Sequence, residues 1–223
     1  MRDALNTDLT NLNASFLRMQ SLAVEQLSML RAALSAGSFN GLGDRLKALD
    51  RSIDDLERDL EASCLTVIAR HQPLAGDLRF VLMIFKSLAD LERVGDYASH
   101  AGRDLEALSA SVRSGPLSDV LPLINLLSEM LEKLAYAFAE RDQPTARLVI
   151  RLDDDVDALY EQMQRASLTR ILEDPRDLPS AMRIARLSRH LERLGDHIQN
   201  VAERVEAYLS SRPGAASEVS RAG

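Results

Sequence analysis

The chain has 223 residues, a hydrophobic content of 46% and a formal net charge of -7 at pH 7. This length allows one large domain or two modest ones, each able to bury a core. The acidic balance argues against a general nucleic-acid binder, because such binding depends on Lys and Arg side chains that neutralise phosphates. No apolar run is long enough to span a bilayer, the N-terminus lacks the pattern of a signal peptide, and Cys64 is the only cysteine. We therefore expect a protein of the reducing cytoplasm.

Three helices are predicted in the first half of the chain. Apolar residues recur every three and four positions from Leu5 to Leu34, which indicates a long amphipathic helix that ends before Gly37. A second helix is expected over 44–70. Pro73 suits the first turn of a third helix, because its missing amide is not needed there, and this helix should fade near 114–116.

The second half repeats the plan. A fourth helix is expected over 117–140, with Pro122 in its opening turn or marking its true start. A fifth helix restarts near Pro144 and runs to about residue 172, and after a break over 173–179 a sixth helix ends near Ser210.

These elements predict an all-α protein, because no segment alternates with the period of a β-strand. The expected fold is two pseudo-symmetric three-helix bundles that arose by internal duplication. The first bundle should span 1–114 and the second 115–210. Residues 211–223 are small and polar, and we expect them to form a disordered tail.

A six-residue phrase occurs twice: Leu-Glu-Arg-Val-Gly-Asp from Leu91 and Leu-Glu-Arg-Leu-Gly-Asp from Leu191. In a helix, the Glu and Asp of each phrase lie four residues apart and project from one face, about 6 Å apart along the axis. These pairs are Glu92 with Asp96 and Glu192 with Asp196. Like charges at this spacing repel, so the repeated arrangement indicates a site.

Each phrase also contains a glycine within its helix, Gly95 or Gly195, which costs roughly 1 kcal/mol relative to alanine. A glycine there would let an ion, a water molecule or another backbone come close. Close packing of two helices is the alternative explanation.

A second pair of carboxylates is repeated upstream of the phrases. When Ile53 is aligned with Val156, two aspartates four residues apart occupy equivalent places in each half. They are Asp50 and Asp54 in the first half and Asp153 and Asp157 in the second half. Four carboxylates that converge from two helices need a positive partner, because they would otherwise repel and raise one another's pKa.

A metal ion or a small metal cluster meets that need. Oxygen-rich sites suit Mg, Ca or Mn, and iron also accepts them, so residue type does not choose the metal. The alternative is an ordinary solvated face on which Arg93 and Arg193 pair with Asp96 and Asp196. The repetition of the carboxylates and the glycine favours the metal site.

Two further residues are candidate metal ligands. His100 and Asn200 lie four residues beyond Asp96 and Asp196, so each could extend its row of carboxylates by one helical turn. His197 should point elsewhere, while His71 and His190 are expected at the surface or at helix caps. The Glu-x-x-His element of di-iron oxidases, nucleotide-binding loops, zinc spacings and nucleophile signatures do not occur, so we do not expect an enzyme.

The motifs resemble those of the PhoU family of phosphate-signalling regulators. The resemblance extends from the first to the sixth helix, and its most specific elements lie at 72–79, 90–97 and 191–203. It implies two pseudo-symmetric three-helix bundles with surface metal clusters, including iron clusters, held by Glu/Asp-x-x-x-Asp pairs. The matching positions are Asp50, Asp54, Glu92, Asp96, Asp153, Asp157, Glu192 and Asp196.

The resemblance also implies a function without catalysis. Such a regulator restrains a phosphate-sensing histidine kinase and the ATPase of the phosphate ABC transporter when phosphate is plentiful, and it forms a homodimer. Family members usually have Asn where this chain has His100, a difference that could change metal preference or be neutral.

Together, these observations predict a cytoplasmic, metal-binding adaptor that negatively regulates phosphate uptake. It should reach the inner membrane only through its partners, and we expect no nucleic-acid partner. The alternatives are a metal-dependent hydrolase or oxidase, which would use the metal to activate water or oxygen, and a metal-free helical scaffold.

Overall fold

The structure is a computed structural model that describes residues 2–109 and 119–211. This part of the chain is helical and contains no strand, so the all-α prediction is confirmed. A short 3₁₀ helix, η1 (Pro175–Asp177), precedes the last α-helix. The α-helices are α1 (Arg2–Ala36), α2 (Leu42–His71), α3 (Ala75–Ser109), α5 (Leu121–Glu140), α6 (Gln143–Glu173) and α7 (Leu178–Ser210).

Two prolines start helices as predicted. Pro122 lies in the first turn of α5, and Pro144 lies in the first turn of α6, where Asp142 accepts a hydrogen bond from the Thr145 amide at 3.3 Å. The prediction for Pro73 was wrong. Gln72 ends α2 in the left-handed conformation with φ 47°, and the chain turns through Pro73 before α3 begins at Ala75. The left-handed cap therefore decides where the third helix starts.

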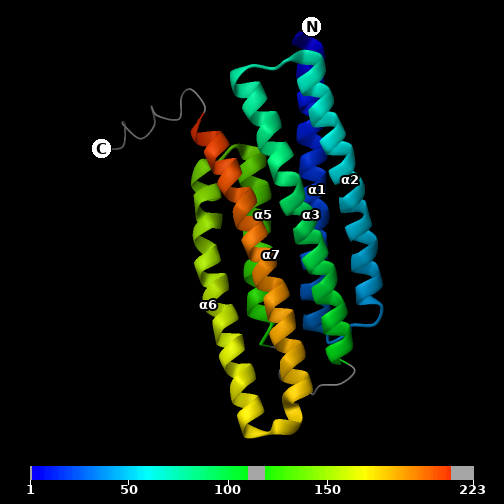
Figure 1. The fold of residues 1–223 in the computed structure, drawn as a ribbon, viewed down its shortest axis with the longest axis vertical. Coiled ribbons are helices and arrows are strands. Elements are labelled where there is room, and N and C mark those ends of the chain that lie inside the picture. The colour runs from blue at the N-terminus through cyan, green and yellow to red at the C-terminus, as the bar shows by residue number, and fades with distance from the viewer. Residues whose placement is uncertain (1, 110–118, 212–223) are drawn as a thin grey trace, which may run out of the picture.

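Helices α3 and α7 run antiparallel along the middle of the molecule, and α2 and α6 lie outside them (Figure 1). Helices α1 and α5 lie behind and contact each other, with Phe16 packed edge-on against Phe138 at a ring distance of 4.8 Å. The two halves thus form an elongated pair of three-helix units. None of the helices in the described ranges is both long and apolar enough to cross a membrane.

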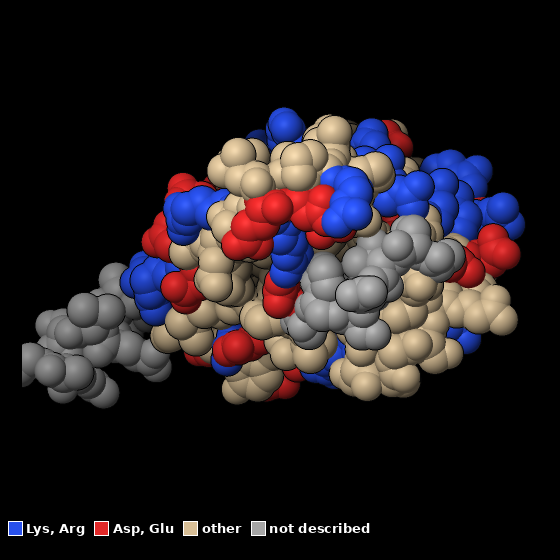
Figure 2. Space-filling view, turned by 90° about the horizontal axis from the view of Figure 1, so that it is seen from below, with Lys and Arg blue, Asp and Glu red and all other residues tan. Residues whose placement is uncertain are grey.

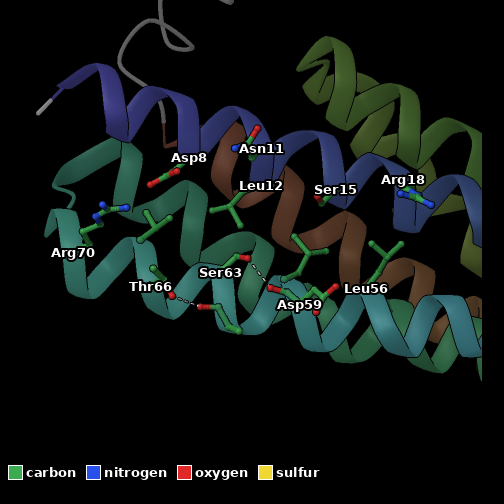
Figure 3. A pocket seen from close by; sticks show the side chains of 13 residues that line it. Asp8, Asn11, Leu12, Ser15, Arg18, Leu56, Asp59, Ser63, Thr66 and Arg70 are labelled. Carbon is green, nitrogen blue, oxygen red and sulfur yellow. Dashed lines mark hydrogen bonds between the residues drawn. The ribbon is translucent and has the colours of Figure 1, made fainter.

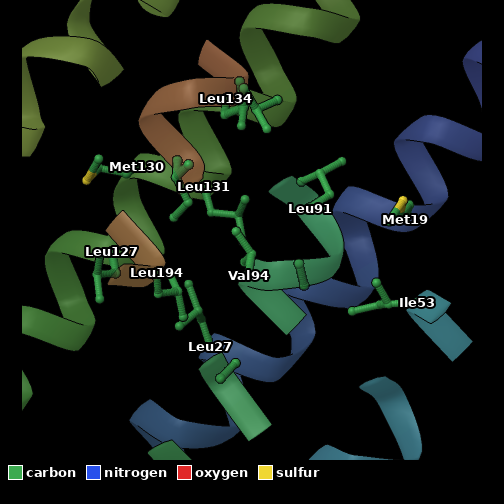
Figure 4. Close-up of a cluster of buried hydrophobic side chains, with 14 of the residues drawn as sticks. Met19, Leu27, Ile53, Leu91, Val94, Leu127, Met130, Leu131, Leu134 and Leu194 are labelled. Carbon is green, nitrogen blue, oxygen red and sulfur yellow. The ribbon is translucent and has the colours of Figure 1, made fainter. Parts of the chain in front are cut away.

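One hydrophobic core joins the two units. Leu27 and Val94 of the first half lie in the same buried cluster as Leu127 and Leu194 of the second half (Figure 4). The predicted boundary near residue 115 lies outside the described residues, as does the predicted tail at 211–223 apart from Ser211. The division into 1–114 and 115–210 therefore stays a prediction, and the described halves share their core.

Candidate metal centres

Helices α2 and α3 come unusually close at Gly95. A Cβ atom on Gly95 would lie 2.9 Å from Ile53 Cδ1 and 3.3 Å from Asp50 Oδ1. Both distances are shorter than ordinary van der Waals contact, so a side chain at this position would displace its neighbours. Close helix packing therefore accounts for this glycine, and it also brings the buried Asp50 carboxylate against α3.

The second half repeats this contact between α6 and α7. A Cβ atom on Gly195 would lie 3.1 Å from Val156 Cγ1 and 3.2 Å from Asp153 Oδ1. The alignment of Ile53 with Val156 thus corresponds to an equivalent position in space. We call Asp50, Asp54, Glu92 and Asp96 the first carboxylate group, and Asp153, Asp157, Glu192 and Asp196 the second carboxylate group.

The inner aspartate of each group is buried and incompletely hydrogen-bonded. Asp50 is 0% exposed and Asp153 is 7% exposed. The Oδ1 atom of each is buried without a hydrogen-bond partner. A buried carboxylate oxygen without a donor is costly unless a cation or a proton compensates it, so both positions fit a cation.

Charges within the first group act on one another. Burial, followed by the charge of Asp96, raises the pKa of Glu92 to about 7. Burial and the charge of Asp50 raise the pKa of Asp54. Arg93 donates to Asp96 at 2.9 Å and its Nε lies 3.3 Å from Glu92 Oε2. The pairing of Arg93 with Asp96, which was the alternative to a metal site, is therefore present in this half.

The second group is less well compensated. Burial, followed by the charges of Asp196 and Asp157, raises the pKa of Asp153 to about 7. Burial also raises the pKa of Glu192 and of Asp196. The nearest approach of Arg193 to this group is 3.9 Å, to Glu192 Oε2. Among the described residues, Arg193 forms no ion pair with Asp196 that matches the pair in the first half.

The eight carboxylates gather in two groups, but their side chains do not close around a point. Within residues 2–109 and 119–211, no three Asp, Glu, His or Cys side chains are arranged as the ligands of one metal ion. The orphaned Oδ1 atoms and the raised pKa values fit a cation, which would draw the outer carboxylates inward. Metal binding by these residues thus stays a prediction.

The two additional candidate ligands lie at the contact between α3 and α7. The Asn200 amide donates to Asp90 Oδ1 at 3.1 Å, so it faces α3 and not the second carboxylate group. The His100 ring lies 5.4 Å from that of His190, centre to centre, and its Nδ1 is buried without a partner. Burial, followed by the charge of Arg103, lowers the pKa of His100.

Asp90 is the centre of a polar contact that joins α3 to α7 and that sequence reasoning missed. His197 Nδ1 lies 2.7 Å from Asp90 Oδ1, and Arg204 forms an ion pair with the same carboxylate. Although burial acts to raise the pKa of Asp90, the hydrogen bonds from His197 and Arg204 hold it below its usual value. His197 thus points away from the carboxylate groups, as predicted.

A second polar contact joins the same helices. Asp104 of α3 pairs with Arg186 of α7, and His190 Nδ1 lies 3.1 Å from Asp104 Oδ2, outside hydrogen-bond geometry. His71 contacts Asp8 of α1 at 2.8 Å, and its side chain is 5% exposed. His71 is the last residue of α2 and the His190 side chain is 24% exposed, but both also make contacts between helices that the sequence did not predict.

Helix α1 also contributes a residue that the sequence did not point to. The buried Gln26 donates through Nε2 to the backbone oxygens of Leu46 at 3.2 Å and Gly95 at 3.3 Å. Its Oε1 has no partner and lies near Gly95. In the second half, Leu127 approaches Gly195 in the same way. On the side that faces the core, the first carboxylate group therefore has a polar neighbour, Gln26, and the second has an apolar one, Leu127.

A groove of about 480 Å³ lies between α1 and α2 (Figure 3). It is lined by Ser15, Asp59 and Ser63 together with apolar side chains such as Leu12. None of the eight predicted carboxylate ligands lines it. The candidate centres are therefore contacts between helices, and not the walls of this groove.

A family model described as the PhoU domain matches residues 16–105 and 120–205, one segment in each half, and each segment includes parts of all three helices of its half. The chain belongs to the PhoU family. The two matched PhoU segments coincide with the two units that repeat the carboxylates and the glycine contact. Family membership and the six-helix fold thus agree with the duplication read from the sequence.

Named relatives and solved PhoU structures are similar over nearly their whole length. A Deinococcus radiodurans protein named "Phosphate-specific transport system accessory protein PhoU homolog" is 42% identical, over 94% of this chain and 98% of its own. The crystal structure of PhoU from Pseudomonas aeruginosa has a TM-score of 0.87 at 32% identity, over 93% of this chain and 99% of its own. PhoU from Streptococcus pneumoniae, described as a phosphate transport system regulatory protein, has a TM-score of 0.79 at 25% identity, over 92% of this chain and 96% of its own.

Proposed function

We propose that this protein is a regulatory accessory protein of a phosphate transport system that acts by binding its partners. The observation that carries the proposal is the full-length similarity to the Deinococcus radiodurans protein with the accessory-protein name. In this proposal the protein works in the cytoplasm as a homodimer. It restrains a phosphate-sensing histidine kinase and the transporter ATPase when phosphate is plentiful.

One part of the surface is suited to contacts with a protein partner. In the described residues, large exposed apolar side chains concentrate at the end formed by the α6–α7 connection, namely Leu168, Leu172, Leu178 and Met182. Figure 2 looks onto the molecule from that end, where basic and acidic side chains are interspersed around uncharged surface. Exposed apolar residues with a mixed polar rim suit a protein partner.

The cation part of the proposal assigns a divalent or transition metal ion to at least one of the two carboxylate groups. Such an ion would compensate the orphaned oxygens of Asp50 or Asp153 and remove repulsion within each group. It would thereby fix the spacing of α2 against α3, or of α6 against α7, on the surface that partners reach. In this proposal the ion has a structural role and takes no part in catalysis.

One feature would suit an enzyme. Glu92 and Asp153 have pKa values raised to about 7, in the range where a carboxyl can act as an acid or a base near neutral pH. Turnover of a phosphate ester that is lost in Asp153→Asn would favour a metal-dependent hydrolase. We expect no such turnover, because mutual repulsion and burial explain both shifts.

Capture of partners tests the adaptor role. The tagged full chain is incubated with detergent-solubilised membranes from phosphate-replete cells, and retained proteins are identified by mass spectrometry. Retention of the sensor kinase and the transporter ATPase, with less retention by Leu172→Glu, would support the proposal. If neither protein is retained under any phosphate condition, the adaptor role is wrong.

A further inference from the structure

The two carboxylate groups differ at the residue three positions before their inner aspartate. In the first half this residue is Lys47, whose ammonium forms an ion pair with Asp50 Oδ2. In the second half it is Ile150, which packs against the hydrophobic core. The duplicated framework thus carries a cation in one half and an uncharged side chain in the other.

Lys47 lies among the carboxylates of its group. Its hydrogen bond with Asp50 raises its pKa, against the effect of burial, and the charges of Asp50, Asp54 and Asp96 act in the same direction. Arg93 supplies a second positive charge to Asp96 and Glu92. The first carboxylate group is therefore compensated by side chains of the protein itself.

The second carboxylate group has no equivalent of Lys47. Asp153 is more than nine-tenths buried, and its Oδ1 faces Gly195 without a donor. Among the described residues, no Lys or Arg forms an ion pair with Asp153. The Asp153 carboxylate is thus left for an external cation to compensate, whereas Arg193 acts on Glu192 and Asp196.

We propose that Lys47 is a built-in cation that takes the place of a metal in the first carboxylate group, so that a divalent cation binds tightly only at the second group, through Asp153, Asp157, Glu192 and Asp196. This inference rests on the cation part of the proposed function. A metal ion entering the first group would be repelled by the Lys47 ammonium, which already pairs with Asp50 Oδ2. At the second group it meets no such competitor.

The test measures how many Mn²⁺ ions bind to each chain. Mn²⁺ prefers oxygen ligands, and its free fraction can be counted by electron paramagnetic resonance alongside isothermal titration calorimetry. The wild type should bind one ion tightly. Ile150→Lys should weaken that site at least tenfold, and Lys47→Ile should create a second site at least tenfold tighter than any second site in the wild type.

Two charge-neutralising variants assign the sites. Asp153→Asn should abolish tight binding, whereas Asp50→Asn, its equivalent in the first half, should leave it unchanged. Far-UV circular dichroism checks the fold of each variant, and Lys47→Gln replaces Lys47→Ile if the latter does not fold. Because Gln also removes the charge, it too should reveal a second site.

Other outcomes overturn the inference. Two sites of equal affinity in the wild type would show that Lys47 does not compete with the metal ion. Loss of tight binding in Asp50→Asn would place the tightly bound ion in the first carboxylate group. Failure of every variant to bind Mn²⁺ would refute both this inference and the cation part of the proposed function. The adaptor role would then still be judged by partner capture, so the two failures are distinguishable.

Discussion

Replacement of Gly195 by alanine tests whether the close contact between α6 and α7 is needed. Alanine improves helix propensity by about 1 kcal/mol. Its Cβ would lie 3.1 Å from Val156 Cγ1, 3.2 Å from Asp153 Oδ1 and 3.3 Å from Leu127 Cδ2. Val156 is β-branched and stiff, and overpacking of this kind costs roughly 1–3 kcal/mol. We therefore expect a net loss of about 1 kcal/mol in the free energy of unfolding.

Urea denaturation measures this change, and a thermal melt should show a lower Tm, by roughly 2–4 °C per kcal/mol for a chain of this size. Gly76→Ala is the matched control, because this glycine lies in α3 and a Cβ there would meet nothing within 4 Å. The control should be as stable as the wild type or more so. If Gly195→Ala were stabilised as much as Gly76→Ala, the close contact would not require glycine.

Three further changes have distinct expected outcomes. Because the pKa of Asp153 is raised to about 7, the metal-free folded state keeps a proton on this carboxyl that the unfolded state loses between pH 4 and 7. The contribution of Asp153 to the free energy of unfolding should therefore fall over this pH range. Asp153→Asn should reduce the fall by roughly 2 kcal/mol, measured by urea denaturation with chelator present. Asp90→Ala should lower the free energy of unfolding by about 3 kcal/mol, since Arg204 loses its ion pair and His197 its hydrogen-bond partner, whereas Asp55→Ala, which removes an exposed pair with Arg58, should leave Tm unchanged. Glu192→Ala combined with Asp196→Ala should abolish tight Mn²⁺ binding in calorimetry while helix content by circular dichroism is retained.

The helices and the composition of the two carboxylate groups could be predicted from the sequence, because both depend on spacing along one helix or on a repeat. Apolar periodicity and the breaks at Pro and Gly predicted the six α-helices of the described residues, and the alignment of Ile53 with Val156 placed the inner aspartates at equivalent positions. The start of α3 could not be predicted, since it follows from a left-handed conformation at Gln72 that residue type alone does not indicate.

Contacts between the two halves could not be predicted from spacing along a single helix. Asp90 and His197 are 107 positions apart, and helical spacing shows which residues share a face but not which helix that face meets. The difference between Lys47 and Ile150 is visible in the sequence. Its meaning depends on the burial of Asp50 and Asp153, which only the packed structure establishes.

If this PhoU-family protein restrains phosphate uptake, as proposed, its loss should release the phosphate-uptake genes from repression. Expression of the phosphate-uptake genes is measured in phosphate-rich medium, in a strain that lacks this gene and has no second PhoU-family gene. We expect high expression in the deletion strain and a return to the repressed level when the full chain is supplied. Normal repression in the deletion strain would contradict it.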